Sequence, residues 1–152
     1  MRNDREIAMQ RQAVVAEAKT WLKTPYHHSA RIKGAGVDCA QILIAVYSAC
    51  GIIEAFDPGY YPSDWMLHRS EERYLSWIDK YAQVTDTPLP GDIVLYRFGR
   101  CISHGGIVIE WPTIIHAHMP DRQVTLAEGD KGSLGKRLHL FYTLWGKNVR
   151  NT

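Results

Sequence analysis

The chain has 152 residues, of which 45% are hydrophobic and 22% are charged, and its formal net charge is +2. These values are ordinary for a globular protein, so we expect one domain over residues 1–152, and the weak, dispersed charge argues against nucleic-acid binding. No apolar run approaches the roughly 20 residues of a membrane-spanning helix. The charged start from Met1 to Glu6 does not resemble a secretion signal, and three irregularly spaced cysteines argue against a disulfide framework.

Three helices are predicted in the first half of the chain. Apolar residues recur at helical spacing over Glu6–Leu22 and again over Cys39–Cys50, where Gly51 is placed to end the helix. A third helix is predicted over Ser70–Tyr81, with its first residue, a serine, as the N-cap. The segment Glu54–Leu67 is rich in Pro, Tyr and Asp, so we expect it to be irregular.

From Ile93 onward the pattern changes to strands. Runs rich in β-branched and aromatic residues, separated by turn signals, predict strands over Ile93–Tyr96, Ser103–Ile109, Thr113–His118 and Leu138–Trp145. His104 is therefore expected at the start of a strand, and His116 near the end of the next one. Helices first and an antiparallel sheet second predict an α+β domain.

Cys39 lies where a glycine-rich loop runs into an apolar helix. The free N–H groups and the dipole at a helix start favour the thiolate, so we predict that Cys39 is a nucleophile. Cys50 and Cys101 are predicted to be small buried apolar residues. Thiol catalysis also needs an imidazole that takes the proton and a polar group that orients this imidazole, and His104 and His116 can supply both.

Other polar residues near these positions have less specific roles. Asp38 is predicted to cap the helix rather than to act as a general acid. His118 shares a strand face with His116, and it is either a neighbour of the site or a surface residue. His27 and His28 are not expected to be catalytic, although they could contact a substrate.

These residues lie in motifs that resemble the NlpC-type cell-wall cysteine peptidases, a papain-like family. The matching segments are Thr24-Pro25-Tyr26, Asp38-Cys39, Ser103-His104-Gly105-Gly106-Ile107-Val108 and Ile115-His116-Ala117. The resemblance implies an NlpC-type papain-like fold, in which the nucleophile helix packs on an antiparallel sheet, with a triad of Cys39, His104 and His116. It also implies that the Tyr26 hydroxyl helps to stabilise the oxyanion.

The same resemblance implies an activity. The chain would be a thiol endopeptidase or amidase that hydrolyses amide bonds in the peptide stems of bacterial peptidoglycan, with no metal and no other cofactor. Two departures from the family pattern are present: Ala40-Gln41 follow the cysteine in place of Ser-Gly, and His27-His28-Ser29-Ala30 replace two glycines. Alanine is a good helix former, so the first change is tolerable, whereas the second puts bulky polar residues near the mouth of the cleft.

Two further segments resemble the branch of this family that tailed phages encode. They are Ala30–Gly36 and Tyr61–His68. The resemblance implies a component of the phage tail tip that is made in the host cytoplasm, is carried in the virion and acts at the host cell wall or periplasm. Its partners would be peptidoglycan and other tail-tip proteins, and we expect the loop Tyr60–Leu67 to contact the latter.

Three alternatives stay open. The chain could be a structural tail-assembly protein that keeps the peptidase fold with a silenced cleft, or a thiol acyltransferase that uses the same nucleophile. A zinc site could combine His104, His116 or His118 with Cys39 or Cys101, because a His-x-His pair on a strand can chelate a metal. The sequence has no paired ligand motif such as Cys-x-x-Cys, so the zinc alternative has less support than the thiol hydrolase.

Overall fold

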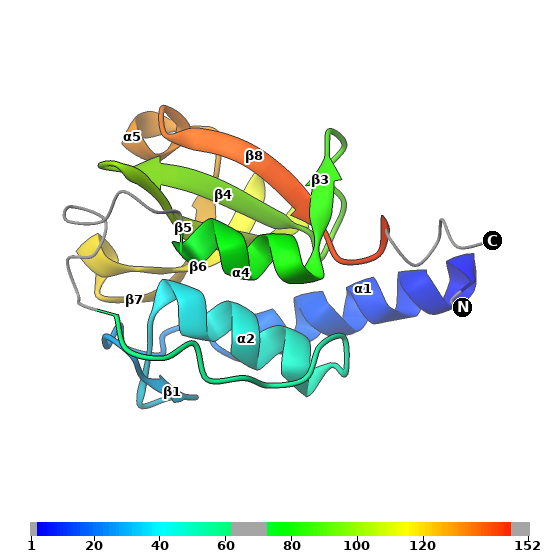
Figure 1. Cartoon of the computed structure of the whole chain (residues 1–152), viewed down its shortest axis with the longest axis horizontal. Coiled ribbons are helices and arrows are strands. Elements are labelled where there is room, and N and C mark those ends of the chain that lie inside the picture. The colour runs from blue at the N-terminus through cyan, green and yellow to red at the C-terminus, as the bar shows by residue number, and fades with distance from the viewer. Residues whose placement is uncertain (1–2, 62–72, 147–152) are drawn as a thin grey trace.

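The computed structural model describes residues 3–61 and 73–146. Its main feature is a six-stranded antiparallel sheet with helices packed against it (Figure 1). The strands are β3 (Gln83–Thr85), β4 (Ile93–Phe98), β5 (Cys101–Glu110), β6 (Thr113–His118), β7 (Gln123–Glu128) and β8 (Leu138–Thr143), in the order β3-β8-β4-β5-β6-β7. The predicted α+β class is confirmed.

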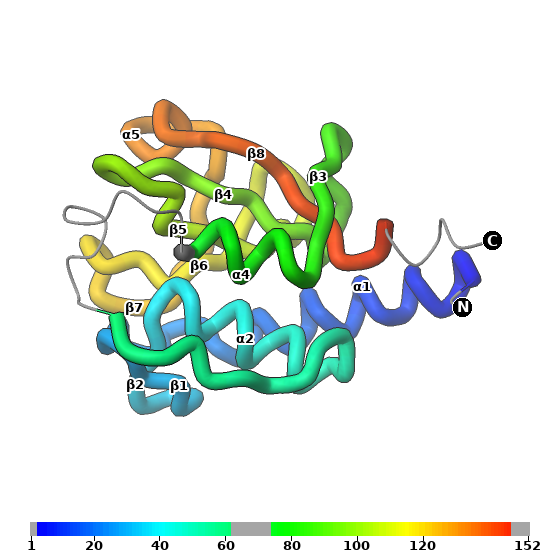
Figure 2. Tube along the Cα trace, in the orientation of Figure 1, coloured from blue at the N-terminus to red at the C-terminus, as the bar shows by residue number. Residues whose placement is uncertain are grey.

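The helices gather on the central strand β5. They are α1 (Asp4–Lys19), α2 (Cys39–Ala49) and α4 (Arg73–Tyr81), and all three contact β5, while α2 also contacts β6. A small hairpin of β1 (Arg31–Ile32) and β2 (Gly36–Val37) lies beside α2 (Figure 2). The remaining elements are the short helix α5 (Gly132–Gly135) and the 3-10 turn η1 (Met119–Asp121). No helix within residues 3–61 and 73–146 is both long and apolar enough to cross a membrane.

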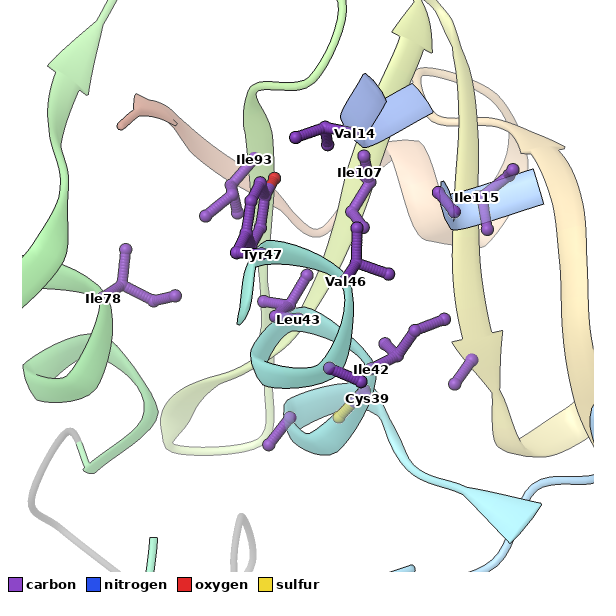
Figure 3. Packing of buried hydrophobic residues seen from close by; sticks show 14 of the residues in the cluster. Val14, Cys39, Ile42, Leu43, Val46, Tyr47, Ile78, Ile93, Ile107 and Ile115 are labelled. Atoms are coloured by element: carbon purple, nitrogen blue, oxygen red, sulfur yellow. The ribbon is translucent and has the colours of Figure 1, made fainter. Parts of the chain in front are cut away.

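Side chains alternate along each strand, and both faces of the sheet carry buried clusters. Ile107 and Ile115 pack with the helices in the main core, together with Ile42 and Val46 of α2 (Figure 3). The neighbouring Val108 and Ile114 point to the other face and form a second cluster with aromatic rings and with leucines around α5. The central strands are therefore almost continuously buried, which explains their apolar sequences.

The helix predictions hold in position but not in every boundary. The first helix begins at an Asn3 capping box and ends at Lys19, three residues before the predicted Leu22, because Trp21 and the next residues form tight turns instead. The second helix ends at Ala49, and Gly51 follows with φ +72 as a helix stop requires. The predicted N-cap Ser70 lies outside the described residues.

The strand predictions need three corrections. Strand β5 begins at Cys101, so His104 is its fourth residue and not its first. The extension follows from pairing with β4, where Tyr96 lies opposite His104 and a register shift lies next to it. Strands β3 and β7 were not predicted. In β7, Val124 and Leu126 lie two residues apart and share a face, but Val124 is buried and Leu126 is 51% exposed. The last strand ends at Thr143, although Leu144 and Trp145 are buried beyond it.

Candidate active site

Asp38 fixes the start of helix α2 and with it the position of Cys39. The Oδ1 atom of Asp38 accepts hydrogen bonds from the backbone N–H groups of Ala40 at 3.1 Å and Gln41 at 2.8 Å. Cys39 is consequently the first helical residue, and its sulfur lies at that end of the helix next to Ile42 (Figure 3). The predicted capping role of Asp38 is confirmed.

The second oxygen of Asp38 ties this helix start to two loops. It accepts the backbone N–H of Ser29 at 2.8 Å and the hydroxyl of Tyr61 at 2.5 Å. The Tyr61 carbonyl oxygen in turn lies 2.7 Å from Nε2 of His28. Asp38 and Tyr61 are both only 2% exposed, so the bond between them is inside the protein, whereas the contacts of Ser29 and His28 are only partly buried. No motif in the sequence links Tyr61 to Asp38, and sequence reasoning missed this contact.

Tyr26 reaches Cys39 because its backbone is held from two sides. Its N–H donates to the carbonyl of Arg122 at 2.8 Å, and the flanking residues pair with Val37, directly before Asp38. The Tyr26 hydroxyl lies near the Cys39 side chain, and the pKa of Tyr26 is raised by burial first and by Cys39 second. The structure thus brings together Tyr26 and Cys39, which the sequence predicted to act on the same oxyanion.

The thiol faces the strand that carries His104. Cys39 Sγ donates a hydrogen bond to the carbonyl oxygen of Ser103 at 3.4 Å, and not to the imidazole of His104. From α4, the Tyr74 hydroxyl donates to the Cys39 carbonyl at 2.9 Å. This close approach requires a glycine at position 105, since a Cβ atom there would lie 2.7 Å from the Tyr74 hydroxyl. Sequence reasoning did not identify Tyr74, because a tyrosine in an amphipathic helix carries no distinctive signal.

His104 and His116 form a buried pair on adjacent strands. Nε2 of His104 lies 2.8 Å from Nδ1 of His116, and the two side chains come from β5 and β6. The rings of Tyr96 and Phe98 flank His104, with centroids 5.9 Å and 5.5 Å away. The pairing leaves the Nδ1 atom of His104 as the nitrogen that can serve a thiol, as the proposed roles of base and orienting residue require.

Burial keeps the three site residues neutral. It raises the pKa of the Cys39 thiol well above its ordinary value, and the negative charge of Asp38 adds to this effect. Burial also lowers the pKa of His104 well below the ordinary value, with smaller contributions from His116 and His118. For His116, burial and then His118 lower the pKa to about 3. Burial therefore opposes the thiolate that was expected at the helix start, and it outweighs the backbone N–H groups there, which lower the pKa of Cys39.

The other candidate residues fall into two groups. Cys101 is buried as predicted, whereas Cys50 is half-buried at the end of α2, and all three cysteines are free. Within the described ranges, the group of His, Cys, Asp and Glu side chains close enough to hold a metal is His116, His118 and Asp121. This set differs from the zinc sites considered from the sequence, because it includes an aspartate and neither Cys39 nor Cys101.

The backbone arrangement is shared with known structures. It superposes on the NlpC/p60 domain of the peptidoglycan hydrolase SagA with a TM-score of 0.58 and 18% identity, over 88% of this chain and 97% of that one. The chain has the NlpC/p60 fold. An NlpC/p60 family protein from Bacillus cereus matches with a TM-score of 0.65 and 16% identity, over 88% of this chain but 40% of that one.

A third similar structure is the peptidoglycan hydrolase RipB from Mycobacterium tuberculosis. It matches with a TM-score of 0.64 and 14% identity, over 93% of this chain and 67% of that one. The sequence matches no family model and no curated protein. The similarity therefore concerns the fold, and the predicted NlpC-type papain-like fold is confirmed by it.

Proposed function

We propose that this chain is a thiol hydrolase that cuts amide bonds in the peptide stems of peptidoglycan. The observation that supports this most is the arrangement of Cys39 at the start of a buried helix, against the strand that carries the hydrogen-bonded pair His104 and His116. Two of the similar structures are those of peptidoglycan hydrolases, which supports the choice of substrate class.

The reaction would begin with a proton transfer inside the site. The Cys39 side chain leaves the Ser103 carbonyl, and its thiol proton passes to Nδ1 of His104. The sulfur then attacks the scissile carbonyl carbon, and the negative oxygen of the tetrahedral intermediate accepts hydrogen bonds from the Cys39 backbone N–H and the Tyr26 hydroxyl. Because the thiol and the imidazole are both neutral at rest, His104 acts as a general base and not as half of a preformed ion pair.

His104 completes the cycle by returning the proton. Its imidazolium protonates the leaving amine, which breaks the amide bond and leaves an acyl group on Cys39. A water molecule, deprotonated by His104, then hydrolyses this thioester and regenerates the free enzyme. Throughout, the Nε2–H of His104 donates to Nδ1 of His116, and this bond holds the ring and its tautomer in place.

The test is digestion of purified peptidoglycan followed by mass spectrometry of the released muropeptides. The wild-type protein should release fragments with newly exposed stem termini, while Cys39→Ala and His104→Ala should release none, and the double variant should be no worse than either. Cys50→Ser is the matched control, because it removes a half-buried thiol at the far end of α2. Fragments joined to an added amine would indicate a thiol acyltransferase, and wild-type inactivity would favour a structural protein with a silenced cleft.

We further propose that the protein works as part of a phage tail tip. The support is the resemblance of Ala30–Gly36 and Tyr61–His68 to proteins of that branch. The first segment folds as the β1–β2 hairpin beside α2, and Tyr60, which directly precedes the second, is 81% exposed. Positions 62–68 lie outside the described residues. The protein would then be made in the host cytoplasm, be carried in the virion and act at the host wall, with tail-tip proteins as partners.

Proteomics of purified virions tests this assignment independently of the chemistry. The chain should be present in assembled particles at a constant ratio to known tail proteins. If it is found in the lysate and never in particles, the tail assignment is refuted, and the muropeptide assay still decides the hydrolase.

A further inference from the structure

His116 of the histidine pair also belongs to a cluster of three potential metal ligands at the end of β6. His116 and His118 point the same way from the strand, and their rings are stacked with centroids 4.6 Å apart and an angle of 20° between planes. Asp121 follows in η1, and its Oδ2 lies 2.9 Å from Nδ1 of His118. One ligand atom from each of the three residues lies within 4.8 Å of the others.

One atom of this cluster has no hydrogen-bond partner. His116 is 1% exposed, and its Nε2 atom is buried. Among the buried side-chain nitrogen and oxygen atoms of the described residues, this is the one without a hydrogen-bond partner. The other nitrogen of the ring, Nδ1, is bonded to His104. Buried polar atoms are almost always satisfied in native proteins, so an unpartnered imidazole nitrogen inside a group of ligands points to a missing partner.

We propose that His116, His118 and Asp121 bind a zinc ion, and that the bound ion switches the active site off. Two imidazole nitrogens and a carboxylate oxygen are typical zinc ligands, and a water molecule would complete four-coordination. Zinc–nitrogen bonds of about 2.0–2.1 Å place tetrahedral ligand atoms roughly 3.4 Å apart. The wider spacings of the cluster must therefore shorten, and the 2.9 Å contact between Asp121 and His118 must lengthen. The half-exposed side chain of Asp121 and the 23% exposed side chain of His118 have room to make this movement.

Zinc would disable the base by inverting two tautomers, a step that rests on the proposed function. Catalysis needs a free lone pair on Nδ1 of His104, so its proton must be on Nε2 and be donated to Nδ1 of His116. An ion on Nε2 of His116 takes the lone pair there and moves the ring proton to Nδ1. The Nδ1–H of His116 now donates to Nε2 of His104, so the proton of the His104 ring moves to its Nδ1 atom. The Cys39 thiol then faces an N–H group and has no imidazole acceptor for its proton.

The zinc site can be tested without any catalytic activity. Isothermal titration of Cys39→Ser protein with zinc chloride should show one ion per chain, since this variant lacks the competing nucleophile. In the same background, His118→Phe keeps a stacked ring without a ligand atom and Asp121→Asn keeps the shape without the charge, and each should weaken binding at least tenfold. His139→Gln, in β8, is the control and should bind zinc normally. Unchanged affinity in both cluster variants would overturn the site.

The switch is tested by muropeptide release with zinc chloride and after its removal by EDTA. Zinc should stop release by the wild-type protein, and EDTA should restore it. His118→Phe and Asp121→Asn should each keep at least half of their own metal-free rate at a zinc concentration that stops the wild type. Equal inhibition of these variants would mean direct attack of zinc on the thiol and would refute the switch. A protein that binds zinc at this site but releases no muropeptides in EDTA would refute the hydrolase and leave the metal site standing.

Discussion

Replacement of Asp38 by alanine tests whether a single carboxylate holds the nucleophile in place. The side chain accepts four hydrogen bonds, from the backbone N–H groups of Ala40, Gln41 and Ser29 and from the Tyr61 hydroxyl. Asp38 and Tyr61 are both 2% exposed, so no water replaces the bond between them directly. Asp38→Ala therefore removes the cap of α2 and leaves the Tyr61 hydroxyl inside the protein without an acceptor.

The magnitude follows from the two kinds of bond that are lost. Loss of an N-cap side chain costs about 1 kcal/mol. A buried donor that loses its acceptor costs about 1–3 kcal/mol, and here that donor is the Tyr61 hydroxyl. Ser29 is exposed, so its N–H can bond to water instead. We therefore expect Asp38→Ala to lower the free energy of unfolding by about 2–4 kcal/mol, a large part of the stability of an ordinary domain.

Urea unfolding followed by tryptophan fluorescence measures this change. Asp57→Ala is the matched control, since Asp57 also accepts a backbone hydrogen bond, from Gly59 at 2.9 Å, but on an exposed loop. It should change the free energy of unfolding by less than about 0.5 kcal/mol. A loss below about 1 kcal/mol for Asp38→Ala would show that the network around the helix start contributes little, and the reasoning from burial would be refuted.

Three further predictions concern the site itself. Because burial raises the pKa of Cys39, its thiolate fraction should still grow with pH near pH 9. Alkylation of Cys39 by iodoacetamide should therefore accelerate about tenfold per pH unit between about pH 7 and 9. A plateau of this rate below about pH 8 would indicate a preformed ion pair with His104. His116→Asn should retain more muropeptide release than His116→Ala, since the amide oxygen can accept the His104 N–H, and equal rates would contradict the orienting role. Gly105→Ala should lower the free energy of unfolding by about 2 kcal/mol, because its Cβ would meet the Tyr74 hydroxyl. The same substitution should cost clearly less in a Tyr74→Phe background, where that hydroxyl is gone. An equal loss in both backgrounds would show that the strain arises elsewhere.

Local sequence signals predicted the elements that carry the chemistry. The apolar spacing after Cys39, a capping aspartate before it and a stop at Gly51 define α2 almost to the residue. Strand-forming runs around His104 and His116 likewise predicted β5 and β6. These features succeed because helix caps and strand propensities act between residues close in the chain. Strand β7 was missed because its apolar alternation consists of only Val124 and Leu126, which is too short to separate a strand from a loop.

The chemical state of the site was decided only by the tertiary structure. The sequence favoured a thiolate at the helix start, since the dipole and the free N–H groups are local properties of α2. The neutral thiol results from burial against β5 and from the charge of Asp38, and burial depends on how α2, α4 and the sheet pack together. The contacts of Tyr61 and Tyr74 with the helix start arise in the same way, because residues 23 and 35 positions away meet it only after folding. The unpartnered nitrogen of His116 also became visible only when the surrounding side chains were in place.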